Sequence, residues 1–235
     1  MGMLNTALAM IIGTLSSISV SCVHFGNRNI VSSERLLSPF EKVNSGGNAE
    51  VRFHESQEYR AVITVDSNLE EFVDLKTRNG TLHIGTKPGG SYSFSTLLVD
   101  VYCPRLSGVS ISGSGNFTGM DKITSPSFES NVSGSGNIEG TVECDNYYAV
   151  ISGSGKITIT GTGSNSNIRI SGSGDFHGFD FRIDRATAHI SGSGKMNIWA
   201  MENIDARVSG SGSIVYRGNP KIAFSGSGSG KIKSE

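Results

Sequence analysis

Apolar and polar residues alternate along the second half of the chain, around a short motif rich in glycine. In VSISGSGNFTG, one parity holds Val109, Ile111, Gly113, Gly115 and Phe117, and the other parity holds Ser and Asn. A period of two is typical of a β-strand, whereas an amphipathic helix needs a period of 3.6. The pattern therefore predicts strands whose apolar residues point inward and whose serines point outward.

The motif repeats, and its spacing predicts the architecture. Ser-Gly-Ser-Gly begins at Ser112, Ser133, Ser152, Ser171, Ser191, Ser209 and Ser225, with a mean spacing of about 19 residues. Helical solenoid repeats have roughly 34 to 47 residues and propeller blades roughly 40 to 50. A unit of about 19 residues suits one coil of a β-solenoid. We therefore expect an all-β fold in which residues 105–235 form a parallel β-helix of about seven short coils.

Stacked coils would align equivalent residues in columns. We expect one column to fill the core, made of Phe117, Ile138, Ile157, Phe176, Met196 and Ile214. The first serine of each motif would form a row on the surface. The repeated glycines indicate either a narrow corner without room for a side chain or a bend that needs positive φ. The last copy, at Ser225, looks compressed.

Residues 36–104 lack the motif but still have strand-like segments, including AEVRFH, YRAVITVD and LLVDVYCP. We expect a β-rich region that caps the solenoid and continues into it. SNLEEFVDLK, from Ser67, is compatible with a short helix. Two domains with a boundary near residue 105 and one continuous domain over 36–235 both remain open.

The N-terminus has the features of an export signal. The apolar stretch Leu8–Val20 is shorter than the roughly 20 residues of a membrane-spanning helix, which favours a signal peptide over residues 1–21. Small residues precede Cys22, as in the lipobox of bacterial lipoproteins, so Cys22 is the expected lipid attachment site. Residues 22–35 would then be a polar tether. Simple cleavage without lipidation is the alternative.

Composition and charge exclude several classes of function. The chain has 31 glycines among 235 residues, 17% charged residues and a net charge of -1. No basic run is present to neutralise phosphates, so we expect no nucleic-acid partner. The five His and three Cys show no ligand spacing, so we expect neither a metal nor a cofactor. Cys103 and Cys144 are expected to be buried free thiols, with a disulfide as the alternative.

Two outward columns are candidates for chemistry. The column before the motif contains Arg169, His189 and Arg207 and no acid, which makes these residues candidate contacts for an acidic or sugar ligand. The column after the motif reads Asn116, Asn137, Lys156, Asp175, Lys195 and Ser213. Its single carboxylate provides neither the paired acids of a polysaccharide-cleaving enzyme nor the recurring Asp of a calcium roll. We therefore expect no catalytic residues, and an ordinary solvated face is the alternative for both columns.

Three segments together resemble a known family: PFEKVNSGGNAEVRF, NLEEFVDLKTRNGTLHI and the repeats that begin with VYCPRLSGVSISGSGNFTG. Their order is similar to that in the GIN domain, the head domain of auto-transporter adhesins, over roughly residues 36–218. The resemblance implies a parallel β-helix, a location in the Gram-negative cell envelope and an adhesive role.

These observations lead to one expected function. The protein would be exported, anchored to the outer membrane by a lipid on its surface or periplasmic side, and would bind a surface glycan or protein through its repetitive face. The alternatives are an envelope spacer or oligomer building block without its own ligand, and a β-helix polysaccharide-active enzyme. Flat faces and open strand edges also favour a homo-oligomer.

Overall fold

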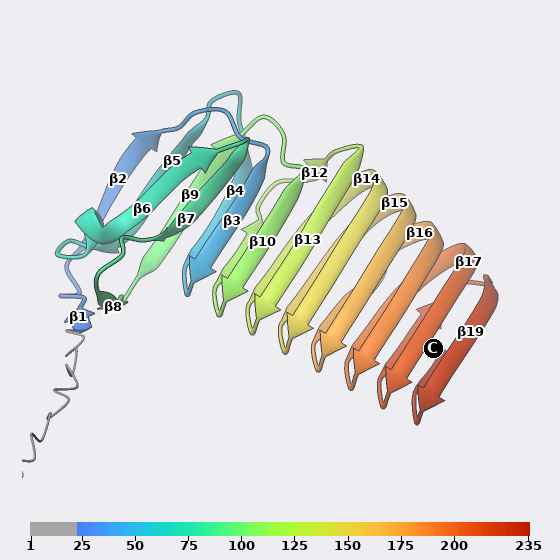
Figure 1. Ribbon diagram of the computed structural model, residues 1–235. Helices are drawn as coiled ribbons and strands as arrows, with labels where there is room; N and C mark the ends of the chain where they lie inside the picture. The colour runs from blue at the N-terminus through green and yellow to red at the C-terminus, as the bar shows by residue number, and fades with distance from the viewer. Residues whose placement is uncertain (1–22) are drawn as a thin grey trace, which may run out of the picture.

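The computed structural model describes residues 23–235 as an almost entirely β structure (Figure 1). The strands of the first half are β1 (Val23–Phe25), β2 (Ile30–Leu36), β3 (Lys42–Gly47), β4 (Glu50–Glu55), β5 (Arg60–Asp66), β6 (Val73–Arg78), β7 (Thr81–Thr86), β8 (Ser91–Ser93) and β9 (Leu97–Cys103). Those of the second half are β10 (Gly108–Gly113), β11 (Asn116–Gly119), β12 (Ile123–Thr124), β13 (Ser127–Gly134), β14 (Asn137–Gly153), β15 (Lys156–Gly172), β16 (Asp175–Gly192), β17 (Lys195–Gly210), β18 (Ser213–Arg217), β19 (Lys221–Gly228) and β20 (Lys231–Ser234).

Helical structure in the described part is limited to one 3-10 turn, η1 (Glu70–Phe72). This turn lies in the segment for which the sequence is compatible with a short helix. The residue before the turn, Leu69, occupies the N-cap position, and no side chain caps the turn. No helix within residues 23–235 is long and apolar enough to cross a membrane.

The coils are built from two parallel sheets that meet at the Ser-Gly-Ser-Gly corner. The front sheet of Figure 1 contains β7, β3, β10, β13, the second halves of β14 to β17, and β19. The rear sheet contains β9, β4, β11, the first halves of β14 to β17, β18 and β20. The long strands bend from one sheet into the other. The expected parallel β-helix of short coils is therefore confirmed.

The predicted core column is also confirmed. Phe117 lies opposite Ile138, and the pairing continues through Ile157, Phe176, Met196 and Ile214. All six side chains are at most 1% exposed. Stacking of these side chains removes apolar surface from water in every coil, and this burial is the main favourable contribution to folding.

The two glycines of each motif have different roles. Gly153, the first of its pair, has a φ of 118°, a value that residues with a side chain rarely adopt. The next residue, Ser154, donates its backbone N–H to the carbonyl oxygen of Gly134 in the preceding coil, over 2.9 Å. Gly155, the second of the pair, is buried, and a Cβ there would lie 2.5 Å from the carbonyl oxygen of Gly136. A Cβ at Gly153 would likewise lie 2.5 Å from the carbonyl oxygen of Gly134. The first glycine therefore provides the bend, and neither glycine has room for a side chain.

At both ends of the row of repeats, the position of the corner differs from the one predicted from the sequence. Ser209 pairs with Ser227 rather than Ser225, so the last coil keeps a normal length of 18 residues and is not compressed. At the other end, Gly47 has positive φ and pairs with Gly113, which makes Ser-Gly-Gly-Asn at residues 45–48 an additional corner. The first coil therefore lies within the half that lacks the motif.

The N-terminal region both starts and caps the solenoid. Strands β3 and β4 belong to the coils, while β2 pairs antiparallel with β5 and β6 pairs antiparallel with β7 at the end of the stack. One hydrophobic core runs from Phe40 to Ile214. This core crosses residue 105 without interruption.

The expected tether over residues 22–35 is wrong for its described part. Val23–Phe25 pairs with β8, and Ile30–Leu36 pairs with β5, so this segment is part of the folded domain. The polarity that suggested a tether reflects a strand at the edge of the fold with one side in water. The segment expected to be a signal peptide, residues 1–21, and Cys22 lie outside the described residues.

Candidate functional site

Arg169, His189 and Arg207 lie on adjacent strands of the front sheet. Arg169 is opposite His189, and His189 is opposite Arg207, in β15, β16 and β17. Each side chain points outward because it alternates with a buried neighbour, Ile168 and Ile170 in the case of Arg169. Strand spacing places the backbones of the two arginines roughly 9.6 Å apart, with His189 between them. The structure thus brings together the three residues that the sequence singled out.

These three residues line a shallow groove of about 510 Å³ on the front sheet. Val150 extends the groove on the N-terminal side, and Ser225 extends it on the C-terminal side. Its other margin is the row of exposed serines at the end of each front strand, here Ser171, Ser191, Ser209 and Ser227. The groove therefore offers cationic groups on one side and hydroxyl groups on the other.

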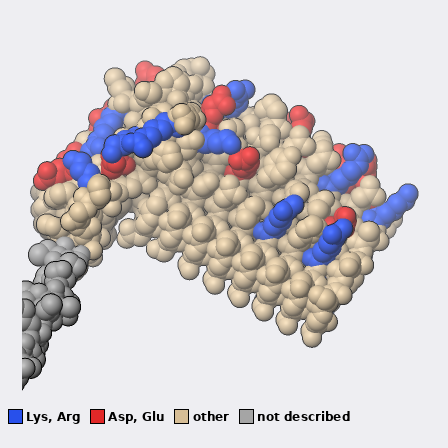
Figure 2. All heavy atoms as spheres, in the orientation of Figure 1, with Lys and Arg blue, Asp and Glu red and all other residues tan. Residues whose placement is uncertain are grey.

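The arginines of this groove form no ion pair within the described chain. Arg169 donates to the amide oxygen of Asn167 over 3.3 Å, and neither Arg169 nor Arg207 forms an ion pair among residues 23–235. By contrast, Arg185 on the same sheet lies 2.8 Å from Glu202. Figure 2 shows Lys and Arg side chains on the front face over the C-terminal coils, with an Asp or Glu side chain beside one of them, above an edge without charged side chains. This arrangement can donate charge-assisted hydrogen bonds to an anion.

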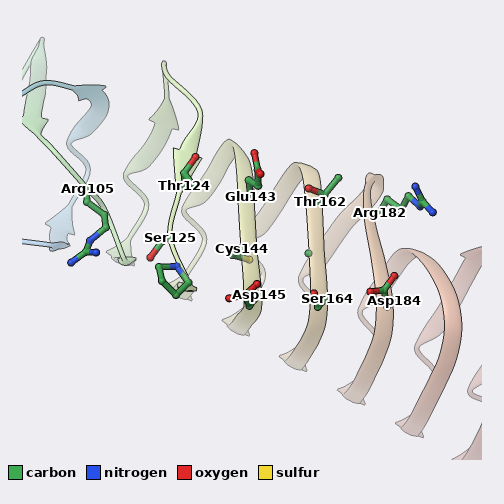
Figure 3. Close-up of a pocket in the computed structure, with 12 residues that line it drawn as sticks. Arg105, Thr124, Ser125, Glu143, Cys144, Asp145, Thr162, Ser164, Arg182 and Asp184 are labelled. Atoms are coloured by element: carbon green, nitrogen blue, oxygen red, sulfur yellow. The ribbon is translucent and has the colours of Figure 1, made fainter.

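A second groove, of about 680 Å³, lies where the long strands bend between the two sheets (Figure 3). Asp145, Ser164 and Asp184 form a row on three successive coils, and Arg105 and Arg182 lie at opposite ends of the groove. The sequence did not reveal this groove because the bends vary in length and do not repeat the motif.

Glu143, also in the bend groove, is already paired. Its carboxylate lies 2.7 Å from the ammonium group of Lys122, and this hydrogen bond holds the pKa of Glu143 below its ordinary value. Glu143 is therefore ionised at neutral pH and is not suited to donate a proton as a general acid. Within residues 23–235 there is no group of three His, Cys, Asp or Glu side chains placed to hold a metal ion.

Cys103 and Cys144 are buried free thiols, one of the two alternatives that the sequence left open. Burial raises the pKa of each thiol to about 12. Both groups therefore remain protonated at neutral pH and are poor nucleophiles.

Comparison with known proteins agrees with this architecture. Residues 39–220 match the family described as "Putative auto-transporter adhesin, head GIN domain". No curated protein matches the chain closely enough to count as a relative.

Solved structures share the fold over nearly the whole chain. A putative adhesin from Bacteroides fragilis NCTC 9343 has a TM-score of 0.84 at 22% identity, with 90% of this chain and 100% of that chain covered. A putative lipid binding protein from Parabacteroides distasonis ATCC 8503 has a TM-score of 0.78 at 25% identity, with 91% and 100% covered. The family match covers most of the sequence, from before the first corner through the motif at Ser209. The chain therefore belongs to the auto-transporter adhesin head GIN domain family.

Proposed function

We propose that this protein is an exported, lipid-anchored envelope protein that binds an acidic glycan through the groove on its front sheet. The observation that carries the proposal is the column of Arg169, His189 and Arg207, whose arginines have no carboxylate partner within the described chain. Binding would satisfy these guanidinium groups with carboxylate or sulfate oxygens. The neighbouring serine row offers hydroxyl groups to the sugar ring.

A linear glycan fits this surface better than a compact ligand. The groove is shallow and follows the stacking direction of the coils, so equivalent contacts recur at roughly 4.8 Å intervals. A lipid ligand, which the name of the relative from Parabacteroides distasonis suggests, is the second candidate, because Ile170, Ile190 and Val208 also line the groove. Val150 is the one exposed apolar side chain among the residues that line the groove.

The binding proposal is tested with paired charge removals. Arg169→Ala/Arg207→Ala should weaken binding to an immobilised carboxylated or sulfated polysaccharide by at least about tenfold, because each charge-assisted hydrogen bond contributes roughly 1.5–3 kcal/mol. The matched control is Lys156→Ala/Lys195→Ala, which removes two cations from one column of the rear sheet. Unchanged binding of the arginine variant, or equal loss in the control, would reject the front groove as the site.

The anchor is tested separately in the native host. Metabolic palmitate labelling of the wild-type chain, abolished by Cys22→Ser, is expected. Protease accessibility on intact cells would then show on which side of the outer membrane the domain lies. An unlabelled, freely soluble protein would contradict the anchor without affecting the groove.

A further inference from the structure

The first described residues are fixed tightly to the body of the domain. The Gly26 N–H donates to the carbonyl oxygen of Ser93 over 2.9 Å, and the side-chain amide of Asn68 donates to the carbonyl oxygen of Phe25, also over 2.9 Å. The Arg28 N–H donates to the buried carboxylate of Asp66 over 2.7 Å. The chain is therefore held in place from β1 onward.

Strand β1 presents its two sides to different surroundings. The His24 ring packs against the rings of Phe72 and Tyr92, with centroids 5.5 and 5.6 Å away. Val23 and Phe25 alternate with His24 and point away from it, and they are 47% and 69% exposed. Two apolar side chains thus face outward from a rigid strand at the very start of the described domain.

We infer that Val23 and Phe25 contact the lipid bilayer, so that the domain sits directly on the membrane surface. This inference rests on the lipid anchor proposed above for Cys22. Consecutive Cα atoms lie only about 3.8 Å apart, so a lipid attached to Cys22 enters the bilayer immediately beside Val23. Next to the anchor, the side chains of Val23 and Phe25 would move from water into the boundary between lipid headgroups and acyl chains. This transfer adds to the membrane affinity of the anchor.

The geometry also sets the orientation of the molecule. Strand β1 lies at the end of the molecule opposite to β19 (Figure 1). A domain held at β1 without a flexible stalk therefore carries its C-terminal coils away from the bilayer. The groove at Arg169, His189 and Arg207 lies on these distant coils, where a large ligand can reach it.

The contact is tested by thiol accessibility in the acylated protein reconstituted into phospholipid vesicles. Phe25→Cys is compared with Leu36→Cys. Leu36 is also apolar, is 83% exposed and is the last residue of β2. The parent chain should not react with a membrane-impermeant maleimide, because Cys103 and Cys144 are buried. Both substituted side chains are exposed, so both variants should fold, as circular dichroism would verify.

We expect Phe25→Cys to react about tenfold more slowly in the acylated protein in vesicles than in the same variant with Cys22→Ser, which carries no lipid and is measured without vesicles. Leu36→Cys should react equally in both. Equal reactivity of Phe25→Cys in the two conditions, or equal protection of both positions, would overturn the proposed contact. Rapid labelling of the parent chain would instead reveal a free Cys22, which would identify failure of the anchor itself.

Discussion

At the scale of single residues, each corner of the repeat depends on two glycines that other residues cannot replace. Gly153 has the positive φ that turns the chain, and a Cβ at either Gly153 or Gly155 would lie 2.5 Å from a carbonyl oxygen of the preceding coil. The serines between and before them face water and make no comparable demand. The same requirement recurs in every coil, and the seven motifs account for 14 of the 31 glycines of the chain.

Gly155→Val should lower the free energy of unfolding by about 3 kcal/mol or more, because the new side chain would overlap a methyl group of Val132 and the carbonyl oxygen of Gly136. Gly153→Ala should cost more than the about 1–3 kcal/mol of backbone strain alone, because its Cβ would also lie 2.5 Å from the carbonyl oxygen of Gly134. Urea unfolding measures both. Ser154→Ala in the same corner is the control and should change stability by less than about 0.5 kcal/mol. A loss in Ser154→Ala equal to that in Gly155→Val would contradict the assigned roles.

At the scale of elements, a single carboxylate links three segments that are distant in sequence. Asp66, at the end of β5, accepts hydrogen bonds from the Arg28 N–H, and from the N–H and hydroxyl of Ser95. Burial alone would raise the pKa of Asp66, but these hydrogen bonds outweigh it and hold the pKa below its ordinary value. Ionised Asp66 therefore stabilises the folded state.

The lowered pKa predicts a specific dependence on pH. The contribution of Asp66 should be complete above its unfolded pKa of about 3.9 and should be lost as the pH falls through the lower folded pKa. Asp66→Asn should thus be less stable than wild type by about 2 kcal/mol at pH 7, with the difference shrinking below about pH 4. Denaturant unfolding across this range provides the measurement. Glu71→Gln, which removes an exposed carboxyl, should show no such trend, and a constant difference for Asp66→Asn would refute the assignment.

At the scale of the whole molecule, the domain is a stack in which each coil contacts mainly its neighbours. Strands β14, β15, β16 and β17 pair in register over most of their length. Stability in such a stack is approximately a sum over coils and the interfaces between them. The cap formed by β2 and β6 closes only the N-terminal end of this stack.

Removal of one complete coil should therefore be tolerated. Deletion of residues 154–172 joins Gly153 to Ser173 and preserves both the corner and the parity of every later strand. We expect a folded β protein whose urea m-value is lower by about a tenth, since less surface is exposed on unfolding. Deletion of residues 154–163 removes about half a coil and should prevent folding, because it would destroy the register. Similar behaviour of the two deletions would contradict a modular stack.

The sequence alone was sufficient to predict the architecture and the residues that stack in each column. The alternation of apolar and polar residues, together with the spacing of the motif, predicted the β-helix and the buried column from Phe117 to Ile214. It also predicted that Arg169, His189 and Arg207 share one outward column. These features follow from a local pattern repeated at nearly constant intervals, and such a pattern can be read without knowledge of distant contacts.

Only the tertiary structure decided where the repeat begins and ends and how the N-terminus is held. The corner at Gly47 departs from the motif, and Ser227 is distinguished from Ser225 only by its partner Ser209. The groove at Asp145 and Asp184 requires bends of unequal length to be aligned in space. The predicted tether failed because strands β1 and β2 are stabilised by residues such as Asp66, nearly forty positions away. Contacts between segments so far apart leave no local pattern in the sequence, so they become visible only once the chain is folded.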